Sequence, residues 1–246
     1  MFSFFKKKET KQNITFNYES VIVDMHSHVL PGIDDGAQNV EESVTLVKRM
    51  MAMGIKKIIA TPHIMADFYR NTPETIGNAL TLLKTALAQQ GINIPIEAAA
   101  EHYFDEVFEK MVDERRLMTM GDNFALFEYP FISAPINGYA VIQKMIENGY
   151  KPILAHPERY LYMEMEDIEG LRNWGCNIQM NTIALTGAYG KEIRKRAENM
   201  VDRQLIDFIG SDMHNLRHAA ALQDALNMPY IEKVLIDYPL KNVMLK

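Results

Sequence analysis

The feature that most constrains the fold is a regular alternation of short apolar runs with longer segments of helical periodicity. The apolar runs predict strands at residues 21–23, 57–60, 94–101, 124–127, 152–155, 176–180 and 206–209. Helical spacing with cap and stop residues predicts helices at 39–53, 72–90, 105–116, 137–148 and 190–203, before Trp174, and in the C-terminal remainder. Strands that alternate with helices in this way favour a parallel sheet.

The first predicted strand leads into His26-Ser27-His28. Alternate side chains of a strand share a face, so His26 and His28 point the same way. Two such imidazoles can bind one divalent metal ion, and two structural histidines are the alternative. Other strands also end in potential ligands, which favours a metal site. The candidates, at six strand ends, are His26, His28, His63, Glu101, Glu128, His156, Asp212 and His214.

The distribution of these candidates predicts a closed sheet. An open doubly wound sheet gathers its ligands mainly at one switch point, whereas a barrel brings all carboxyl ends to one rim. We therefore predict a single α/β domain over residues 19–246, a distorted (β/α)7 relative of the eight-fold TIM-like barrel. Residues 1–18, rich in Phe and Lys, are predicted to be a flexible arm. Peripheral contact of this arm with an anionic membrane surface is the alternative.

Composition excludes several classes. The net charge of −6 provides no basic footprint for nucleic acid. The single cysteine, Cys176, excludes an intramolecular disulfide and is expected in the core. No apolar run approaches the ~18 residues of a membrane span, and the N-terminus lacks the apolar stretch of a secretory signal. A reducing, cytoplasmic location is the resulting expectation.

The ligand types indicate the chemistry. Nitrogen and oxygen donors without a thiolate suit zinc, manganese or iron, and their number exceeds what one ion needs. Two or three ions in such a cluster are typical of phosphoryl hydrolysis. Arg159 offers a planar fork for a phosphate, and Arg217 is a second candidate. Tyr103, Tyr129 and Phe131 could flank an aromatic substrate at the rim.

Two further histidines are assigned outside the cluster. His102 directly follows Glu101, so it is expected on the opposite face of its strand. His218 is expected on the surface of a helix.

Seven motifs together resemble the polymerase-and-histidinol-phosphatase (PHP) superfamily. They are His-Ser-His, Pro-Gly-Ile-Asp-Asp-Gly, Thr-Pro-His, Ala-Glu, Phe-Glu-Tyr-Pro, His-Pro-Glu-Arg and Ser-Asp-Met-His-Asn. They are most similar to bacterial tyrosine-protein phosphatases of capsule and exopolysaccharide operons. The resemblance covers about residues 21–220. It implies a distorted (β/α)7 barrel with a trinuclear, commonly manganese-dependent site. The implied substrate is phosphotyrosine in the C-terminal tail of a bacterial tyrosine autokinase.

The resemblance also implies roles for individual residues. The first ion would be held by His26, His28, Glu101 and Asp212. Glu101 would bridge to a second ion, held also by Glu128 and His156. A third ion would be held by Asp35, His63 and His214. Arg159 would bind phosphate, with Asp212 and His156 as its catalytic partners. The family often has Gly-Arg after the last His, whereas this chain has Leu216-Arg217-His218.

The function predicted from these features is a metal-dependent protein-tyrosine phosphatase. One alternative is a small-molecule phosphatase of the histidinol-phosphatase type, and another is a non-catalytic, metal-stabilised regulatory protein. An amidohydrolase is disfavoured because we find no bridging lysine at a strand end. A thiol phosphatase is disfavoured because Thr182 occupies the Arg position of its Cys-x5-Arg loop.

Overall fold

The computed structural model describes residues 17–246, so most of the predicted arm lies outside the described residues. Tyr18, which the prediction placed in the arm, belongs to the barrel. It begins a 3₁₀ turn, η1 (Tyr18–Ser20), and its buried hydroxyl donates to the Leu222 carbonyl at 3.0 Å. The predicted boundary at residue 18 is therefore too late.

The described residues form nine parallel strands in two sheets. The first sheet has the order β1 (Val23–Asp24), β2 (Lys57–Ala60) and β4 (Ile96–Ala98). The second has the order β3 (His63–Ile64), β5 (Glu101–Tyr103), β6 (Phe124–Glu128), β7 (Lys151–Ala155), β8 (Asn177–Asn181) and β9 (Phe208–Gly210).

Nine strands stand where seven were predicted, because the predicted strand at 94–101 is interrupted and because β3 continues beyond the predicted end of the strand at 57–60. β2 and β3 are separated by Thr61 and Pro62, and proline cannot donate to a strand ladder. β4 and β5 are separated at the same level by two alanines. The Glu101 amide donates to the Pro62 carbonyl at 3.1 Å, so the two neighbouring segments of the chain stay side by side through the break. The first strand also begins later than predicted, because Ile22 has a left-handed φ of 66°.

The barrel closes between its first and last strands. The Asp212 amide donates to the His26 carbonyl and the His28 amide to the Met213 carbonyl, each at 2.8 Å. Lower in the seam, the buried Asn242 amide bonds to Val23 on one side and Ile209 on the other. The predicted distorted (β/α)7 barrel is therefore confirmed, and its two-sheet construction is the distortion.

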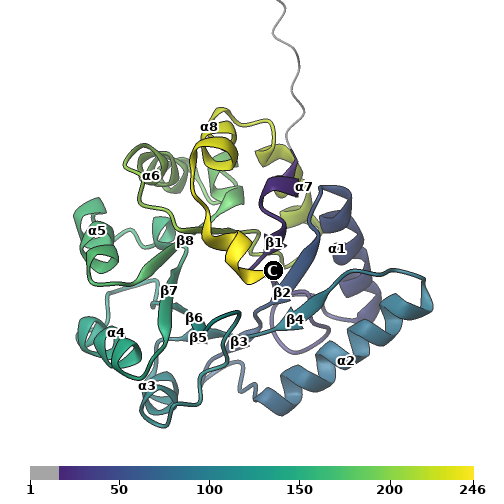
Figure 1. Ribbon diagram of the computed structural model, residues 1–246, viewed down its shortest axis with the longest axis horizontal. Helices are drawn as coiled ribbons and strands as arrows, with labels where there is room; N and C mark the ends of the chain where they lie inside the picture. Colours follow the sequence, from purple (N-terminus) through teal and green to yellow (C-terminus); the bar gives the residue numbers. More distant parts are fainter. Residues whose placement is uncertain (1–16) are drawn as a thin grey trace, which may run out of the picture.

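The helices surround the strands, as Figure 1 shows. Their bounds are α1 (Val40–Ala52), α2 (Pro73–Gln89), α3 (Glu106–Asp113), α4 (Gly138–Glu147), α5 (Met165–Asn173), α6 (Lys191–Asp202), α7 (Leu216–Ala225) and α8 (Pro229–Glu232). Their starts follow local chemistry: the Asn39 side chain caps α1, and Thr72 caps α2 before its first-turn proline. None of these helices is long and apolar enough to cross a lipid bilayer.

The C-terminal segment covers the amino end of the barrel. In Figure 1 this end faces the viewer, and the chain terminates beside β1 and β2. The last turn, η5 (Lys241–Leu245), places Leu245 among interior side chains that include Val23, Phe124 and Phe208. Cys176 is buried, as predicted, in the apolar layer that lies between the strands and the surrounding helices. The amino end is thus filled, and the opposite end carries the cavity.

Candidate metal centre

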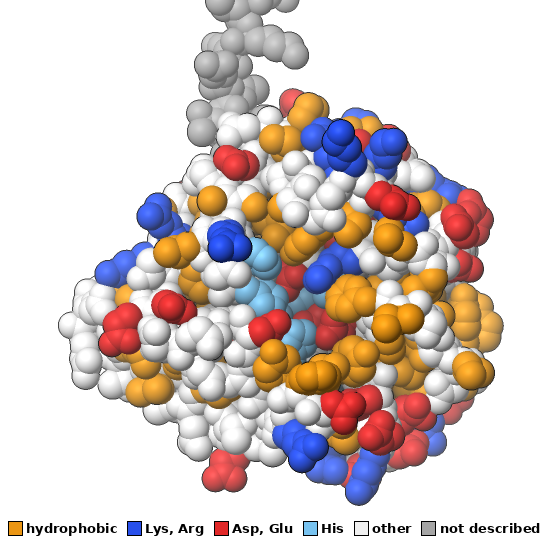
Figure 2. All heavy atoms as spheres, turned by 180° about the vertical axis from the view of Figure 1, so that it is seen from behind, with side chains coloured by type: hydrophobic (Ala, Val, Ile, Leu, Met, Phe, Trp, Pro, Cys, Tyr) orange, Lys and Arg blue, Asp and Glu red, His pale blue; other side chains and the backbone are white. Residues whose placement is uncertain are grey.

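The predicted ligands converge at the carboxyl end of the barrel. Figure 2 shows this face, where histidines gather at the bottom of a hollow beside acidic side chains. The cavity has a volume of about 490 Å³. Its lining includes His63, Glu101, Glu128, His156, Asp212 and His214. His26 and His28 are fully buried directly beneath it.

A first group of donor atoms surrounds the buried histidine pair. His26 Nε2 and His28 Nε2 lie 3.3 Å apart, and each is 3.2 Å from Glu101 Oε2. Asp212 Oδ1 is 3.4 Å from His26 Nε2 and 3.5 Å from His28 Nε2. His26, His28 and Glu101 could hold one divalent ion, and Asp212 lies beside both histidines.

Glu101 extends this group toward a second one. Its Oε1 lies 3.0 Å from His156 Nε2, and its Oε2 lies 3.3 Å from His63 Nδ1. Glu128 Oε1 is 3.2 Å from the same His63 nitrogen. His63, Glu101 and Glu128 can therefore enclose a further cation.

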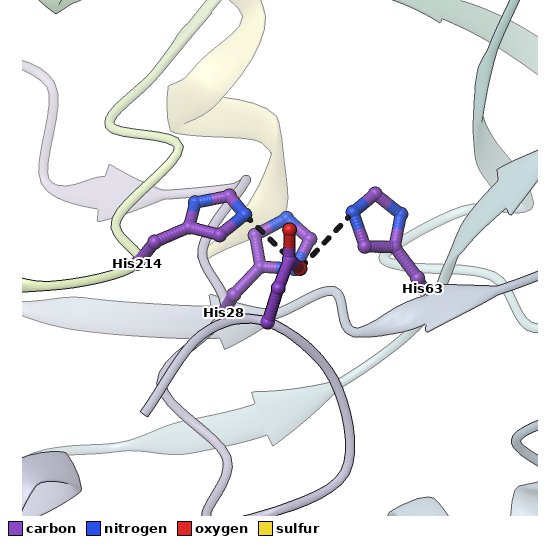
Figure 3. A group of neighbouring side chains, drawn as sticks. His28, His63 and His214 are labelled. Atoms are coloured by element: carbon purple, nitrogen blue, oxygen red, sulfur yellow. Dashed lines mark ion pairs between the residues drawn. The ribbon is translucent and has the colours of Figure 1, made fainter. Parts of the chain in front are cut away.

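A third group involves the half-exposed Asp35. Its Oδ1 lies 3.5 Å from Nε2 of both His63 and His214, and the set is completed by His28. Figure 3 shows the rings of His28, His63 and His214 arranged around a common point, with the two ion pairs dashed. All nine predicted ligand candidates thus lie in one connected cluster.

The electrostatics of the cluster fit divalent cations. Glu101 Oε2 and His63 Nδ1 are buried and have no hydrogen-bond partner among the described residues. Burial alone would lower the pKa of His26, but Glu101 and Asp212 outweigh it and raise that pKa to about 10. Burial alone would raise the pKa of Asp212, but His214, His26 and Arg159 hold it well below its usual range. The carboxylates therefore attract positive charge, and metal ions can supply it in place of protons.

Two residues that the sequence reasoning missed orient the buried histidines. Asp34 Oδ2 accepts a hydrogen bond from His28 Nδ1 at 2.8 Å, and Gln179 Oε1 accepts one from His26 Nδ1 at 2.9 Å. Both acceptors lack a proton to give, so Nδ1 carries it and the Nε2 lone pairs face the cluster. Asp34 stands in the Pro-Gly-Ile-Asp-Asp-Gly motif, whereas nothing in the sequence distinguishes Gln179.

The backbone is adapted to this packing. A Cβ on Gly36 would lie 2.0 Å from the His28 carbonyl oxygen, and one on Gly210 would lie 2.6 Å from His26 Cβ. His156 and Asp212 have positive φ values of 34° and 49°. Such conformations cost about 1–3 kcal/mol each in non-glycine residues and cluster at functional sites.

Arg159 is fixed in the cavity wall. Its guanidinium lies between the rings of Phe131 and Tyr189, 4.6 and 4.7 Å from their centroids. Arg159 Nη1 donates to Asp212 Oδ2 at 3.2 Å, and the Tyr189 hydroxyl donates to the same oxygen at 3.2 Å. Tyr189 was not predicted, because it follows a loop with no recognisable ligand pattern.

Two predicted substrate contacts do not reach the cavity. Strand alternation carries Glu128 inward and turns the buried Tyr129 outward, into the layer beneath α4. Arg217 is exposed at the start of α7 and lines a separate groove with Glu41 and Glu42. Phe131 and Tyr103, by contrast, do line the cavity.

The two remaining histidines behave differently from each other. His102 faces away from the cluster, buried, and donates from Nδ1 to the Leu126 carbonyl at 2.8 Å, as predicted. The surface position predicted for His218 is wrong. It lies on α7 but lines the cavity, and its Nδ1 donates to the Asp212 carbonyl at 2.7 Å.

Fold and site together define a distorted (β/α) barrel with a candidate multinuclear metal centre at its carboxyl rim. Residues 22–242 match the family model of capsular polysaccharide synthesis, CpsB/CapC. The chain belongs to this family.

Named relatives are similar over most of their length. Tyrosine-protein phosphatase YwqE of Bacillus subtilis is 29% identical over 199 residues, which cover 80% of this chain and 78% of YwqE. Tyrosine-protein phosphatase CpsB of Streptococcus agalactiae is 26% identical over 203 residues, which cover 79% of this chain and 84% of CpsB. A crystal structure from work on YwqE of Bacillus subtilis and CpsB of Streptococcus pneumoniae, described as metal-dependent tyrosine phosphatases, superimposes with a TM-score of 0.78. That match has 29% identity and covers 86% of each chain.

Proposed function

We propose that this chain is a metal-dependent phosphomonoesterase that hydrolyses phosphotyrosine in proteins. The substrate we propose is the C-terminal tail of a bacterial tyrosine kinase that controls capsule or exopolysaccharide synthesis in the cytoplasm. One observation carries the enzymatic proposal. Three overlapping groups of nitrogen and oxygen donors and one fixed arginine face the same cavity. The names and the similarity of the relatives support the phosphotyrosine specificity.

The metal part of the proposal distributes the nine candidate ligands over three ions. His26, His28, Glu101 and Asp212 would hold one ion, and Glu101, Glu128 and His156 a second. Asp35, His63 and His214 would hold a third. Mn²⁺ is the proposed metal, two or three ions in number, with Fe or Zn as alternatives. When bound, such ions activate water and stabilise charge on a transferring phosphoryl group.

Arg159 supplies what the donors lack. Among the described residues that line the cavity it is the one arginine, and its contacts with the rings of Phe131 and Tyr189 hold the guanidinium plane in place. A fixed planar fork binds phosphate oxygens with little further loss of side-chain freedom. Asp212 orients Arg159 through Oδ2 while its Oδ1 faces the histidines. His156 contributes its Nε2 beside Glu101.

The cavity suits an aryl phosphate. Its volume of about 490 Å³ lies within the range of small-ligand pockets. Phe131 and Tyr103 at its lining can contact an aromatic ring. A phenol has a pKa of about 10, so a phenolate leaves with less help from a general acid than an alkoxide does.

The test compares three substrates on the full chain. We expect Mn²⁺-loaded protein to hydrolyse a phosphotyrosine peptide with a higher kcat/KM than a phosphoserine peptide or histidinol phosphate. Stripping the metal with a chelator should abolish activity, and added Mn²⁺ should restore it best. A tenfold advantage for histidinol phosphate, about 1.4 kcal/mol of transition-state discrimination, would instead indicate the small-molecule phosphatase. Full activity at negligible metal content would falsify the proposal.

A further inference from the structure

A projecting apolar segment borders the cavity. It comprises residues 131–136, between β6 and α4, and we call it the apolar lip. Phe131 is 44% exposed, Ile132 is 93% exposed and Ile136 is exposed as fully as in an extended peptide, at 107%. Figure 2 shows hydrophobic side chains beside the hollow that holds the histidines. Exposed apolar patches next to a functional site commonly mark a surface that binds a partner.

The lip is also uncharged. From residue 129 to residue 143 the sequence contains no Asp, Glu, Lys, Arg or His. Charged residues make up 24% of the whole chain, and this run has none. A partner segment that fits it is apolar and uncharged, since a charged side chain buried there would lose its hydration without gaining a counter-ion.

Buried and half-buried aromatic residues hold the lip in this exposed position. The Tyr162 hydroxyl donates to the Pro130 carbonyl at 2.8 Å. At the other end the Gly138 amide donates to the Pro135 carbonyl, and a Cβ on Gly138 would lie 2.6 Å from the Tyr129 hydroxyl oxygen. Phe131 packs against Tyr160, with ring centroids 5.6 Å apart. A supported surface loses less entropy on binding than a free loop does.

We propose that the apolar lip binds apolar side chains next to the phosphotyrosine of the protein substrate. This inference rests on the proposed function. Phe131 connects the two sites, because it lines the cavity and stacks on Arg159 while belonging to the lip. A peptide extends about 3.3 Å per residue, so residues one to three positions from the phosphotyrosine leave the cavity at its rim. Ile132 and Ile136 then select aliphatic or aromatic neighbours.

Two other occupants fit the lip less well. An anionic membrane attracts surfaces that carry Lys and Arg, and the lip has neither. A second copy of the chain seated on the lip would cover the rim at Phe131 and obstruct a protein substrate. A substrate segment uses both the lip and the cavity in one binding event.

The test uses the double variant Ile132→Ser/Ile136→Ser in the full, Mn²⁺-loaded protein. A matched control is Ile236→Ser, because Ile236 is 62% exposed on the π-helical segment Lys233–Asp237 and does not line the cavity. The substrates are p-nitrophenyl phosphate and two phosphotyrosine peptides that differ only in having Leu or Ser beside the phosphotyrosine.

We expect wild type and control to prefer the Leu peptide, and the double variant to lose about tenfold in kcat/KM on it, mainly through KM. Its kinetics on the Ser peptide and on p-nitrophenyl phosphate should stay at the wild-type level. Equal use of both peptides by wild type, or no change in the double variant, would overturn the lip proposal and leave the phosphatase proposal intact. A wild-type enzyme inactive on every phosphotyrosine peptide would overturn both.

The same proteins decide between the other occupants. If only the double variant loses co-sedimentation with phosphatidylglycerol vesicles while its peptide kinetics are unchanged, the lip is a membrane contact and the proposal fails. If only the double variant loses a dimer in sedimentation, with the same unchanged kinetics, the lip is a self-association surface and the proposal fails.

Discussion

The two ends of strand β9 each carry a buried aspartate, and their surroundings are opposite in kind. Asp207, at the amino end, is 4% exposed and is bonded by Arg172 at 3.1 Å, by Lys241 at 2.9 Å and by the Ile178 amide at 3.1 Å. Asp212, just beyond the carboxyl end, is 1% exposed, pairs with Arg159 at 3.2 Å and lies beside the histidines of the rim. One end is neutralised by two fixed cations, whereas the other depends on Arg159 and on histidines whose protons a metal ion can replace.

This difference indicates that the two ends of the barrel have different roles. At the amino end, two cations meet one carboxylate, and the C-terminal segment covers the interior, so the contacts serve stability. At the rim, Glu101, Glu128 and Asp212 gather with histidines that could give up their protons to metal ions. A site that leaves charge for a ligand to balance sacrifices stability in the empty state. The comparison can be tested by changing one end at a time.

The largest expected effect is on catalysis. Asp212→Asn should lower kcat by about 10²-fold or more under saturating Mn²⁺, because a ligand carboxylate and the acceptor that orients Arg159 are lost together. Asp207→Asn removes a buried carboxylate from the same strand and should keep kcat within about twofold. Steady-state kinetics on p-nitrophenyl phosphate, with metal content and circular dichroism as controls, measures this. Equal losses in the two folded variants would erase the distinction between the ends.

A smaller effect is expected on metal affinity. Asp34 is a rim carboxylate that the protein does satisfy, because His28 Nδ1 and the amides of Gly36 and His63 all donate to it. In Asp34→Asn, the new side-chain NH₂ group is itself a donor and faces N–H groups that need an acceptor. The His28 ring is therefore held less firmly. We expect Mn²⁺ affinity to fall about 10–100-fold, the range for residues that orient metal ligands. Calorimetric titration of the metal-free protein measures it, with Asp207→Asn as the matched control; unchanged affinity would show that Asp34 only folds the loop.

The sequence predicted the site better than it predicted the details of the fold. Eight of the nine candidates were recognisable because each lies at the end of a predicted strand, and parallel strands end at one rim. Asp35, in a loop, was assigned only through the family resemblance. The continuation of the second strand as β3 and the interruption of the third strand were missed, because local propensity does not report where neighbouring strands lose register. Tyr129 was placed wrongly for a simpler reason: the two-residue alternation that carries Glu128 inward carries its neighbour outward. Gln179 and Tyr189 act through contacts between distant segments, which no local pattern records.

The smallest expected effect concerns acid stability at the amino end. Burial alone would raise the pKa of Asp207, but hydrogen bonds from Arg172 and Lys241 outweigh burial and hold it below its ordinary value of 3.8. A carboxylate with a depressed folded-state pKa adds stability above its unfolded pKa of about 3.9, and this stability is lost as the pH falls toward the folded value. Asp207→Asn lacks this contribution at every pH.

The variant should therefore be less stable than wild type by about 2 kcal/mol near pH 7, less than for a fully buried pair because Arg172 and Lys241 are 40% and 39% exposed. The difference should shrink as the pH is lowered from 6 to 3, since protonation of the wild-type unfolded chain removes the advantage. Urea unfolding of chelator-treated proteins at several pH values measures it, because without metal the rim ligands cannot add a pH-dependent binding term of their own. A difference that is constant with pH would mean that Asp207 acts through its hydrogen bonds alone, and the charge pairing that sets the amino end apart from the rim would then contribute nothing to stability.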